Sequence, residues 1–218
     1  LDSDIAKRLR KQLEQRGVQF ALQSGVTKIE QLEGNTLRVH YQKKGKDAFA
    51  DAELVLMATG RAANVGSLSL ENTEIAYTKA GITVDENMQT NVPGVYAIGD
   101  VNGKQMLAHA ATFQGFRAVN HIVGHADRIL FNIVPAAIFT HPEVGSVGLS
   151  EDQCKEQGMA YKCRKGYYRS NGKAHAGNAT EGMIKLMTDE NDRILGCHLY
   201  GENAAFIAQE VAVLMNFG

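Results

Sequence analysis

The residues best suited to chemistry lie in one stretch, Val95–Gly115, which reads VYAIGDVNGKQMLAHAATFQG. An apolar strand is predicted over residues 95–98 and stops at Gly99 and Asp100, and helical spacing opens at Met106-Leu107-Ala108-His109. Ligands of open α/β sheets bind beyond the carboxyl ends of the strands, where the Asp100 carboxylate offers acceptor oxygens. The first turn of the helix adds unpaired N–H groups and a positive dipole end. Together these groups suit a polyhydroxylated cofactor with an electron-accepting ring; the alternative is a Gly-Asp turn that only caps the helix.

A second glycine follows an apolar run earlier in the chain. Leu54–Met57 resembles a strand covered on both faces, and it leads into Ala58-Thr59-Gly60. Small residues at that point allow a ligand or another backbone to approach closely. Metal chemistry is not indicated, because the histidines show no metal-ligand spacing. The three cysteines, Cys154, Cys163 and Cys197, fit neither a disulfide framework nor a zinc site, so we expect packed free thiols.

The first half of the chain supplies the elements that must position these residues. Ile5, Leu9 and Leu13 predict an amphipathic helix, capped by Asp2, Ser3 or Asp4. Alternation predicts a strand over 18–22, and a hairpin joins 26–29 to 36–41. Lys43, Lys44 and Lys46 indicate a solvated hairpin tip, and residues 82–84 and 95–98 are predicted to be extended. A helix is predicted from about 106 to 124.

The character changes from residue 132 onwards. Extended segments are predicted at 133–135 and 137–139, and Ser150 and Gln153 form a capping-box pattern for a helix that ends at Gly158. Strands are predicted at 161–168, 182–188 and 194–200. The apolar face of a closing helix is formed by Ala204, Ile207, Val211 and Leu214. Several strands with flanking helices predict an α+β domain.

Composition narrows the class of protein. The chain has 218 residues, 44% of them hydrophobic, and a net charge of −1, which gives no basic excess for nucleic acid. We find neither an apolar run long enough to span a membrane nor a signal peptide, so we expect no membrane partner and a reducing compartment. The chain opens at Leu1 without Met and closes after an apolar helical pattern, and we expect it to be an internal piece of a longer protein.

Two groups of motifs carry a family resemblance over essentially all 218 residues. Ala58-Thr59-Gly60-Arg61 and Thr90–Asp100 resemble the paired signatures of the flavin-dependent pyridine nucleotide–disulfide oxidoreductases. Phe139–Val144 with Val147-Gly148-Leu149 resembles the start of the dimerisation domain of that family. Within the family, Met106–His109 resembles the members that reoxidise dihydrolipoamide rather than the glutathione or mercuric reductases.

The resemblance implies α/β nucleotide-binding parts, as incomplete NAD and FAD domains, followed by an α+β interface domain. The implied boundaries are 1–60 for the end of the NAD-binding domain, 61–131 for the end of the FAD-binding domain, and 132–218 for the interface domain, truncated at its C-terminus. Gly99 and Asp100 would hold the ribityl part of FAD, and Met106, Leu107, Ala108 and His109 would lie against its ring. Gly60 would contact NAD.

The sequence also departs from the family pattern. It lacks the G-x-G-x-x-G loop for FAD, the second glycine-rich loop for NAD, and a redox cysteine pair five positions apart. His141-Pro142-Glu143 repeats the letters of the acid–base motif of the family at a different place, so we assign no catalytic residue to this chain. The whole protein is expected to be an enzyme, whereas the piece alone is expected to be inactive.

The resemblance further implies partners and a compartment. These are a homodimer through 132–218, the lipoyl-bearing acyltransferase of a 2-oxo acid dehydrogenase complex, and the bacterial cytoplasm in preference to the mitochondrial matrix. Two alternatives remain open. The chain could belong to another disulfide reductase of the family, or it could be a non-catalytic module for dimerisation and docking.

Overall fold

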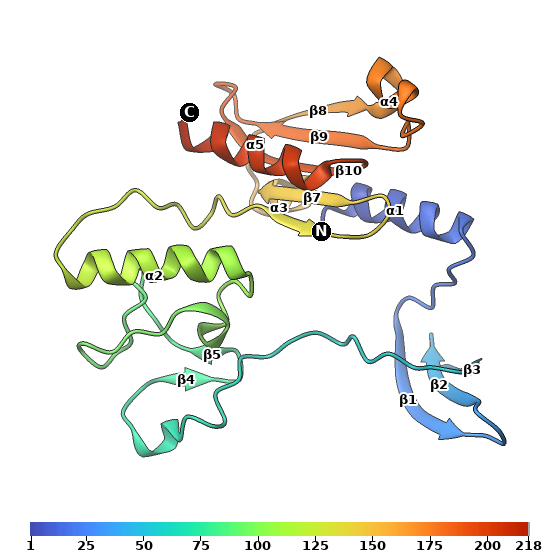
Figure 1. Ribbon diagram of the computed structural model, residues 1–218, viewed down its shortest axis with the longest axis horizontal. Helices are drawn as coiled ribbons and strands as arrows, with labels where there is room; N and C mark the ends of the chain where they lie inside the picture. The colour runs from blue at the N-terminus through green and yellow to red at the C-terminus, as the bar shows by residue number, and fades with distance from the viewer. Residues whose placement is uncertain (218) are drawn as a thin grey trace. The chain divides into compact units, whose positions relative to one another are not determined.

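The computed structural model describes residues 1–217 (Figure 1). The chain divides into two compact units, one formed by residues 1–9 and 62–218 and the other by residues 10–61. One helix, α1 (Ser3–Gln15), runs from the first unit into the second. As predicted, Asp2 caps it: Oδ1 of Asp2 accepts hydrogen bonds from the backbone N–H groups of Asp4 and Ile5.

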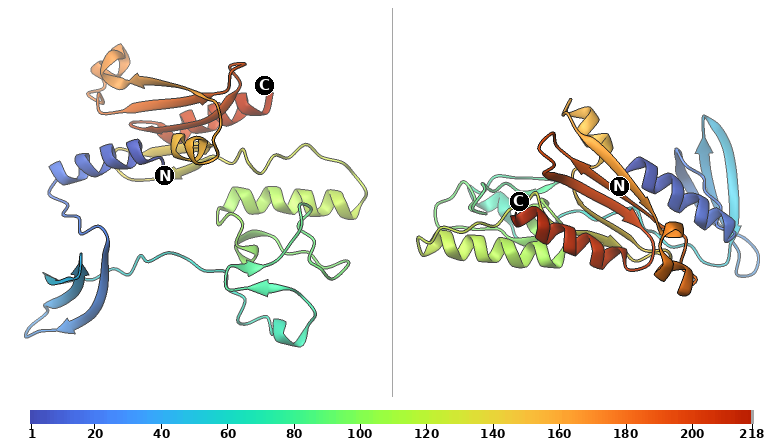
Figure 2. Two further views of the ribbon diagram at one scale, coloured as in Figure 1. Left: turned by 180° about the vertical axis from the view of Figure 1, so that it is seen from behind. Right: turned by 90° about the horizontal axis from the view of Figure 1, so that it is seen from above.

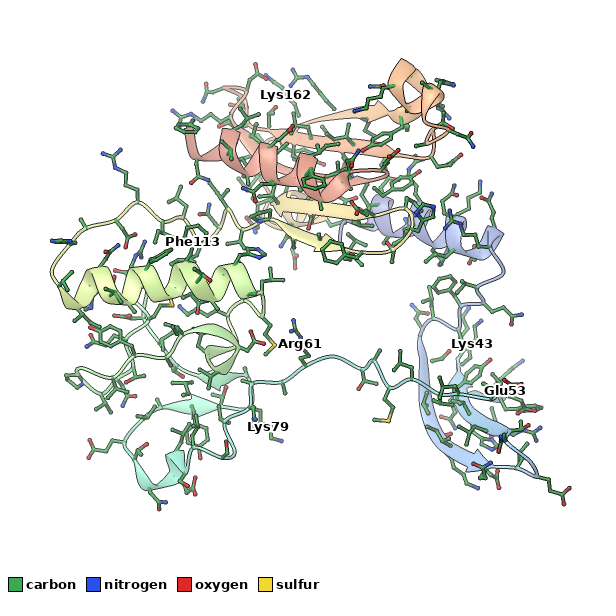
Figure 3. The ribbon with its side chains drawn as sticks, viewed as in Figure 1. Lys43, Glu53, Arg61, Lys79, Phe113 and Lys162 are labelled. Atoms are coloured by element: carbon green, nitrogen blue, oxygen red, sulfur yellow. The ribbon has the colours of Figure 1, made fainter. Side chains whose placement is uncertain are left out.

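The unit of residues 10–61 contains a three-stranded antiparallel sheet in the order β1-β2-β3. Its strands are β1 (Ser24–Gln31), β2 (Leu37–Lys43) and β3 (Lys46–Ala52). The predicted hairpin of β1 and β2 is confirmed, and β3 was not predicted. Lys44 and Gly45 link β2 to β3 with φ of 52° and 76°, the left-handed conformation that a tight two-residue turn requires. Lys43 and Glu53 can be located on this part of the chain in Figure 3.

Two predicted strands of this unit are wrong. Residues 18–22 and 54–57 do not form strands, and Leu54 and Leu56 are 83% and 84% exposed. A strand needs hydrogen-bonding neighbours for its backbone, and no described segment pairs with either run. An apolar run alone therefore did not suffice to make residues 54–57 a strand.

The C-terminal part of the other unit is built on a five-stranded antiparallel sheet in the order β6-β7-β10-β9-β8. Three of its strands match the predictions for 161–168, 182–188 and 194–200. β6 overlaps the predicted extended segment at 137–139, whereas β7 was not predicted. The bounds are β6 (Ala136–Ile138), β7 (Val144–Gly148), β8 (Lys162–Tyr167), β9 (Met183–Thr188) and β10 (Ile194–Tyr200). The short elements η3 (Tyr168–Ser170) and α4 (Gly172–Ala176) follow β8.

Helices cover both faces of this sheet (Figure 2). On one face, α5 (Ala204–Phe217) packs Ala204, Ala208 and Val211 against Cys197 and Leu199 of β10. The predicted apolar face is correct for Ala204 and Val211, but Leu214 is 59% exposed and Met215 takes its place against the sheet. The other face is covered by α3 (Glu151–Glu156) and by the first residues of α1. The predicted capping box of Ser150 and Gln153 is confirmed at the start of α3.

Residues 62–131 form the smaller part of the same unit. Its elements are η1 (Leu70–Asn72), β4 (Tyr77–Thr78), β5 (Gly81–Ile82), η2 (Gly99–Asn102) and α2 (Ala108–Ile122). The predicted helix is confirmed as α2. The predicted strand over 95–98 is wrong, because it is reduced to one bridge between Tyr96 and Gln89. Leu70, Ile82 and Ala97 pack together and hold this part in place.

Candidate functional site

The backbone of the Gly-Asp turn packs closely against α2. Gly99 opens η2 with φ of 75°, a left-handed conformation that favours glycine, and a Cβ there would lie 3.3 Å from the Cβ of Ala111. Asp100 follows with an exposed side chain, while Gly99 and Asn102 are buried. The turn therefore presents a carboxylate to solvent from a fixed backbone.

Gln114 of α2 is a site residue that the sequence analysis missed. It is 1% exposed, and its Oε1 accepts hydrogen bonds from the backbone N–H of Gly99 at 2.7 Å and from the side chain of Asn102 at 2.8 Å. Asn102 also donates to the carbonyl of Ala97 at 3.0 Å. A polar residue at helical spacing among Ala110, Gly115 and Ala118 was the available signal. Gln114 thus fixes the turn that carries Asp100.

The start of α2 has no side-chain cap from the residue at its N-cap position. The helix begins at Ala108, and the side chain of Leu107 makes no capping hydrogen bond. Its N–H groups and dipole favour an electron-rich group at this end. Ala108 and His109 are exposed, and Met106 and Leu107 are half-buried.

His109 has a structural contact of its own. Its Nε2 lies 2.8 Å from the carbonyl oxygen of Pro135, which can only accept, so Nε2 carries the proton and donates. Gln105 donates in the same way to the carbonyl of Phe131 at 3.1 Å. Both bonds tie the residues around the start of α2 to the segment that leads into β6.

A cleft of about 320 Å³ lies beside this contact, between α2 and the C-terminal sheet. His109 and Phe113 line it from α2, and Ala205, Gln209 and Val213 line it from α5. Figure 3 labels Phe113, which projects from α2 and is 47% exposed.

The other predicted site residue, Gly60, belongs to the unit of residues 10–61. It is exposed, its φ is 108°, and a Cβ would meet no atom within 4 Å. Space alone would allow a side chain here, and the backbone conformation is what favours glycine.

The cysteines and His141 show no arrangement for catalysis in the described part of the chain. Cys154, Cys163 and Cys197 are free thiols, and burial raises the pKa of Cys197 to about 12, which disfavours the reactive thiolate. His141 is exposed in the loop after β6, while Glu143 accepts a hydrogen bond from the backbone N–H of Ala205 at the start of α5. Within residues 1–217 no cluster of three or more metal-ligating side chains occurs.

Two family models match the chain. The model described as pyridine nucleotide-disulphide oxidoreductase matches residues 1–115, and the model of the dimerisation domain of the same oxidoreductases matches residues 134–218. In the described residues, no helix is both long and apolar enough to cross a bilayer.

Curated relatives match over the whole chain. Mitochondrial dihydrolipoyl dehydrogenase 1 of Arabidopsis thaliana is 36% identical over 220 residues, which is 100% of this chain and 43% of the relative. The human mitochondrial dihydrolipoyl dehydrogenase is 35% identical over 222 residues, 100% of this chain and 44% of the relative. A leghemoglobin reductase of Glycine max is 35% identical, with 42% of its length covered. The chain therefore spans less than half the length of these relatives.

Solved structures agree with the sequence relatives. LpdA of Mycobacterium tuberculosis superposes with a TM-score of 0.88 and 25% identity, over 98% of this chain and 46% of that protein. The HOCl-induced flavoprotein disulfide reductase RclA of Escherichia coli gives a TM-score of 0.87 and 26% identity, over 100% and 50%. The fold class expected from the sequence is thereby confirmed, and FAD and NAD, the expected cofactors, are those of this group of proteins. The chain belongs to the pyridine nucleotide–disulfide oxidoreductase family.

Proposed function

We propose that the whole protein containing this chain is a dihydrolipoyl dehydrogenase. The observation that carries the proposal is the 36% identity over the entire chain to enzymes of that name. In such an enzyme, FAD with a cysteine pair supplies the chemistry that takes electrons from protein-bound dihydrolipoamide to NAD. This chain contributes no cysteine pair, and its part in the reaction is to bind and orient.

The residues present suit the flavin. Asp100 has an acceptor-only carboxylate on a turn fixed by Gln114, and ribityl hydroxyls are matching donors. Gly99 lets the backbone pass close to a ligand. Met106–His109 bring the uncapped start of α2, whose N–H groups stabilise negative charge on an electron-accepting ring.

The same proposal assigns the remaining domains, the partner and the compartment. Gly60 contacts NAD, at the end of an NAD-binding part formed by residues 1–60, and residues 61–131 end the FAD-binding part. The dimerisation region that was matched at 134–218 pairs two copies, within an interface domain starting at residue 132. The partner is the lipoyl-bearing acyltransferase of a 2-oxo acid dehydrogenase complex. The compartment is the bacterial cytoplasm or, in a eukaryote, the mitochondrial matrix, and the names of the relatives support a mitochondrial location in eukaryotes.

A substrate panel tests the function. The purified whole protein is expected to show the absorbance of bound flavin and to form NADH from NAD with dihydrolipoamide. A second candidate, another disulfide reductase, is favoured by the fold shared with RclA and by the 35% identity to a leghemoglobin reductase. Reduction of glutathione disulfide or mercuric ion without dihydrolipoamide turnover would select it. A colourless, inactive protein would instead point to a docking module.

His141→Ala serves as a control in the same assay. Because His141 is assigned no catalytic role, turnover is expected to stay within about tenfold, less than the roughly 10²–10⁴ that a general acid–base residue supplies. A thousandfold loss with flavin and dimer intact would show that His141 is catalytic.

A further inference from the structure

The first residues of α1 are bound to the dimerisation domain through a buried ion pair. Nζ of Lys185 lies 2.9 Å from both carboxylate oxygens of Asp2 and 2.6 Å from Glu151, and the side chains of Lys185 and Asp2 are 1% and 0% exposed. Burial alone would lower the pKa of Lys185, but the hydrogen bonds with Glu151 and Asp2 outweigh it and raise the pKa to about 12. The lysine therefore stays charged, and its ammonium group is held between the carboxylates of Asp2 and Glu151.

The next two residues are bound to the same domain. The backbone N–H and the hydroxyl of Ser3 donate to the carboxylate of Asp152 at 2.7 and 2.8 Å. Asp4 accepts from Nζ of Lys165 at 2.7 Å. Ile5 and Leu9 of the same helix are also buried, with 0% and 8% of their surface exposed.

The start of α1 also supplies acidic partners for two lysines of the sheet. Lys165 on β8 and Lys185 on β9 are directly opposite in the register, so two positive charges share one face. Like charges at directly opposite positions destabilise a sheet. Asp4, in the first turn of the helix, pairs with Lys165, and Asp2, at its cap, pairs with Lys185. These ion pairs join segments that are far apart in the sequence, since Asp2 and Lys185 are separated by 183 positions.

We propose that Asp2, Ser3 and Asp4 form a latch that fixes the start of α1 onto the dimerisation domain, with Lys185 as the central positioning residue. The latch consists of Asp2, Ser3 and Asp4 on the helix side and Lys185, Lys165 and Asp152 on the sheet side. It joins residues within the 1–115 match to residues within the 134–218 match. Its effect on nucleotide binding rests on the proposed function, whereas the contact itself does not.

Hydrogen exchange in the whole flavoprotein tests the latch. In Lys185→Met, Asp2 and Glu151 lose their shared cation, and removing one partner of a buried pair is strongly destabilising. Amides of α1 are expected to lose protection by roughly a hundredfold or more, while amides of α5 on the opposite face change little. Lys162→Met is the matched control, because Lys162 pairs with Asp192 at the exposed end of the same sheet (Figure 3). If Lys185→Met fails to fold, Asp4→Asn replaces it and is expected to loosen α1 a fewfold, as a half-exposed pair does.

Steady-state kinetics separate positioning from simple stability. With the latch broken, KM for NAD is expected to rise several-fold while kcat and FAD content hold, because the flavin side is untouched. Equal loss of protection in α1 and α5, or none, would overturn the latch. A selective loss in α1 with KM unchanged would overturn the positioning role. Selective loss in a protein that turns over no pyridine nucleotide would keep the contact and reject the proposed function instead.

Discussion

At the Gly-Asp turn, the residue proposed to bind the ligand and the residue that supports the backbone are different. Asp100 has an exposed carboxylate, while Gln114 is buried and accepts a hydrogen bond from the backbone of the turn. Replacing each residue should therefore give a different result, and the two changes can be read separately in the whole protein.

For Asp100→Ala, weaker flavin binding is expected with little loss of fold stability. A hydrogen bond to a charged group contributes roughly 1.5–3 kcal/mol, so FAD should bind on the order of ten- to a hundredfold more weakly. Dialysis followed by the flavin absorbance measures this, with Glu71→Ala as the control, an exposed carboxylate in η1. Full FAD retention by Asp100→Ala would refute the role of this carboxylate.

For Gln114→Met, lower stability is expected together with weaker flavin binding. Methionine keeps the length of the side chain but leaves the buried N–H of Gly99 without its acceptor, at a cost of about 1–3 kcal/mol. Thermal unfolding checks the first effect and FAD titration the second. Gln209→Met, an exposed glutamine on α5, is the matched control. Unchanged unfolding would mean that Gln114 does not support the turn.

Among the elements, the connector after α2 depends on one ion pair. Arg117 of α2 binds Asp127 at 2.8 Å, donates to the carbonyls of Glu86 and Ile129, and lies over the ring of Phe131. The Arg117 hydrogen bonds lower the pKa of Asp127 to about 2. This pair fixes the course of the chain between α2 and the C-terminal sheet.

The pKa of Asp127 predicts how its contribution varies with pH. Because the folded pKa lies below the ordinary value of 3.8, the stabilisation is full above about pH 4 and is lost as the pH falls towards 2. Asp127→Asn should therefore lower the free energy of unfolding by about 2 kcal/mol at neutral pH and by much less near pH 2. Urea unfolding across this range measures the difference, and Asp192→Asn, in an exposed pair, should show little of it. A difference that does not vary with pH would contradict the assignment.

At the scale of the whole molecule, large apolar side chains are exposed in both units. Leu54, Leu56 and Met57 are exposed in one unit, and Phe116 of α2 and Phe206 of α5 are exposed in the other. Large exposed apolar side chains favour association with other protein surfaces or aggregation. Residues 1–218 alone are therefore expected to self-associate.

The same chain, produced alone, is expected neither to retain FAD nor to oxidise dihydrolipoamide. It presents the Asp100 turn and the start of α2 but no glycine-rich loop for a pyrophosphate, which needs a cradle of N–H groups. Gel filtration with light scattering and flavin absorbance, followed by an assay of NADH formation, checks this. A monomeric, yellow and active preparation would contradict both the apolar surface argument and the assignment of missing parts.

The sequence alone determined the local features of the protein. The capping box at Ser150 and the hairpin of β1 and β2 depend on neighbouring residues, so local chemistry predicted them. The family followed from short motifs around Gly60 and Asp100 because binding sites constrain residue types directly.

Only the tertiary structure decided which apolar and charged groups meet. Periodicity predicted strands at 54–57 and 95–98, yet a strand forms only where a neighbour takes up its backbone hydrogen bonds. It predicted the apolar face of α1 but not the sheet beneath it, nor that Lys185 would be buried beside Asp2. Gln114 was missed for the same reason. Contacts between distant residues depend on how distant segments pack, and the spacing of residues along the sequence does not indicate which segments will pack together.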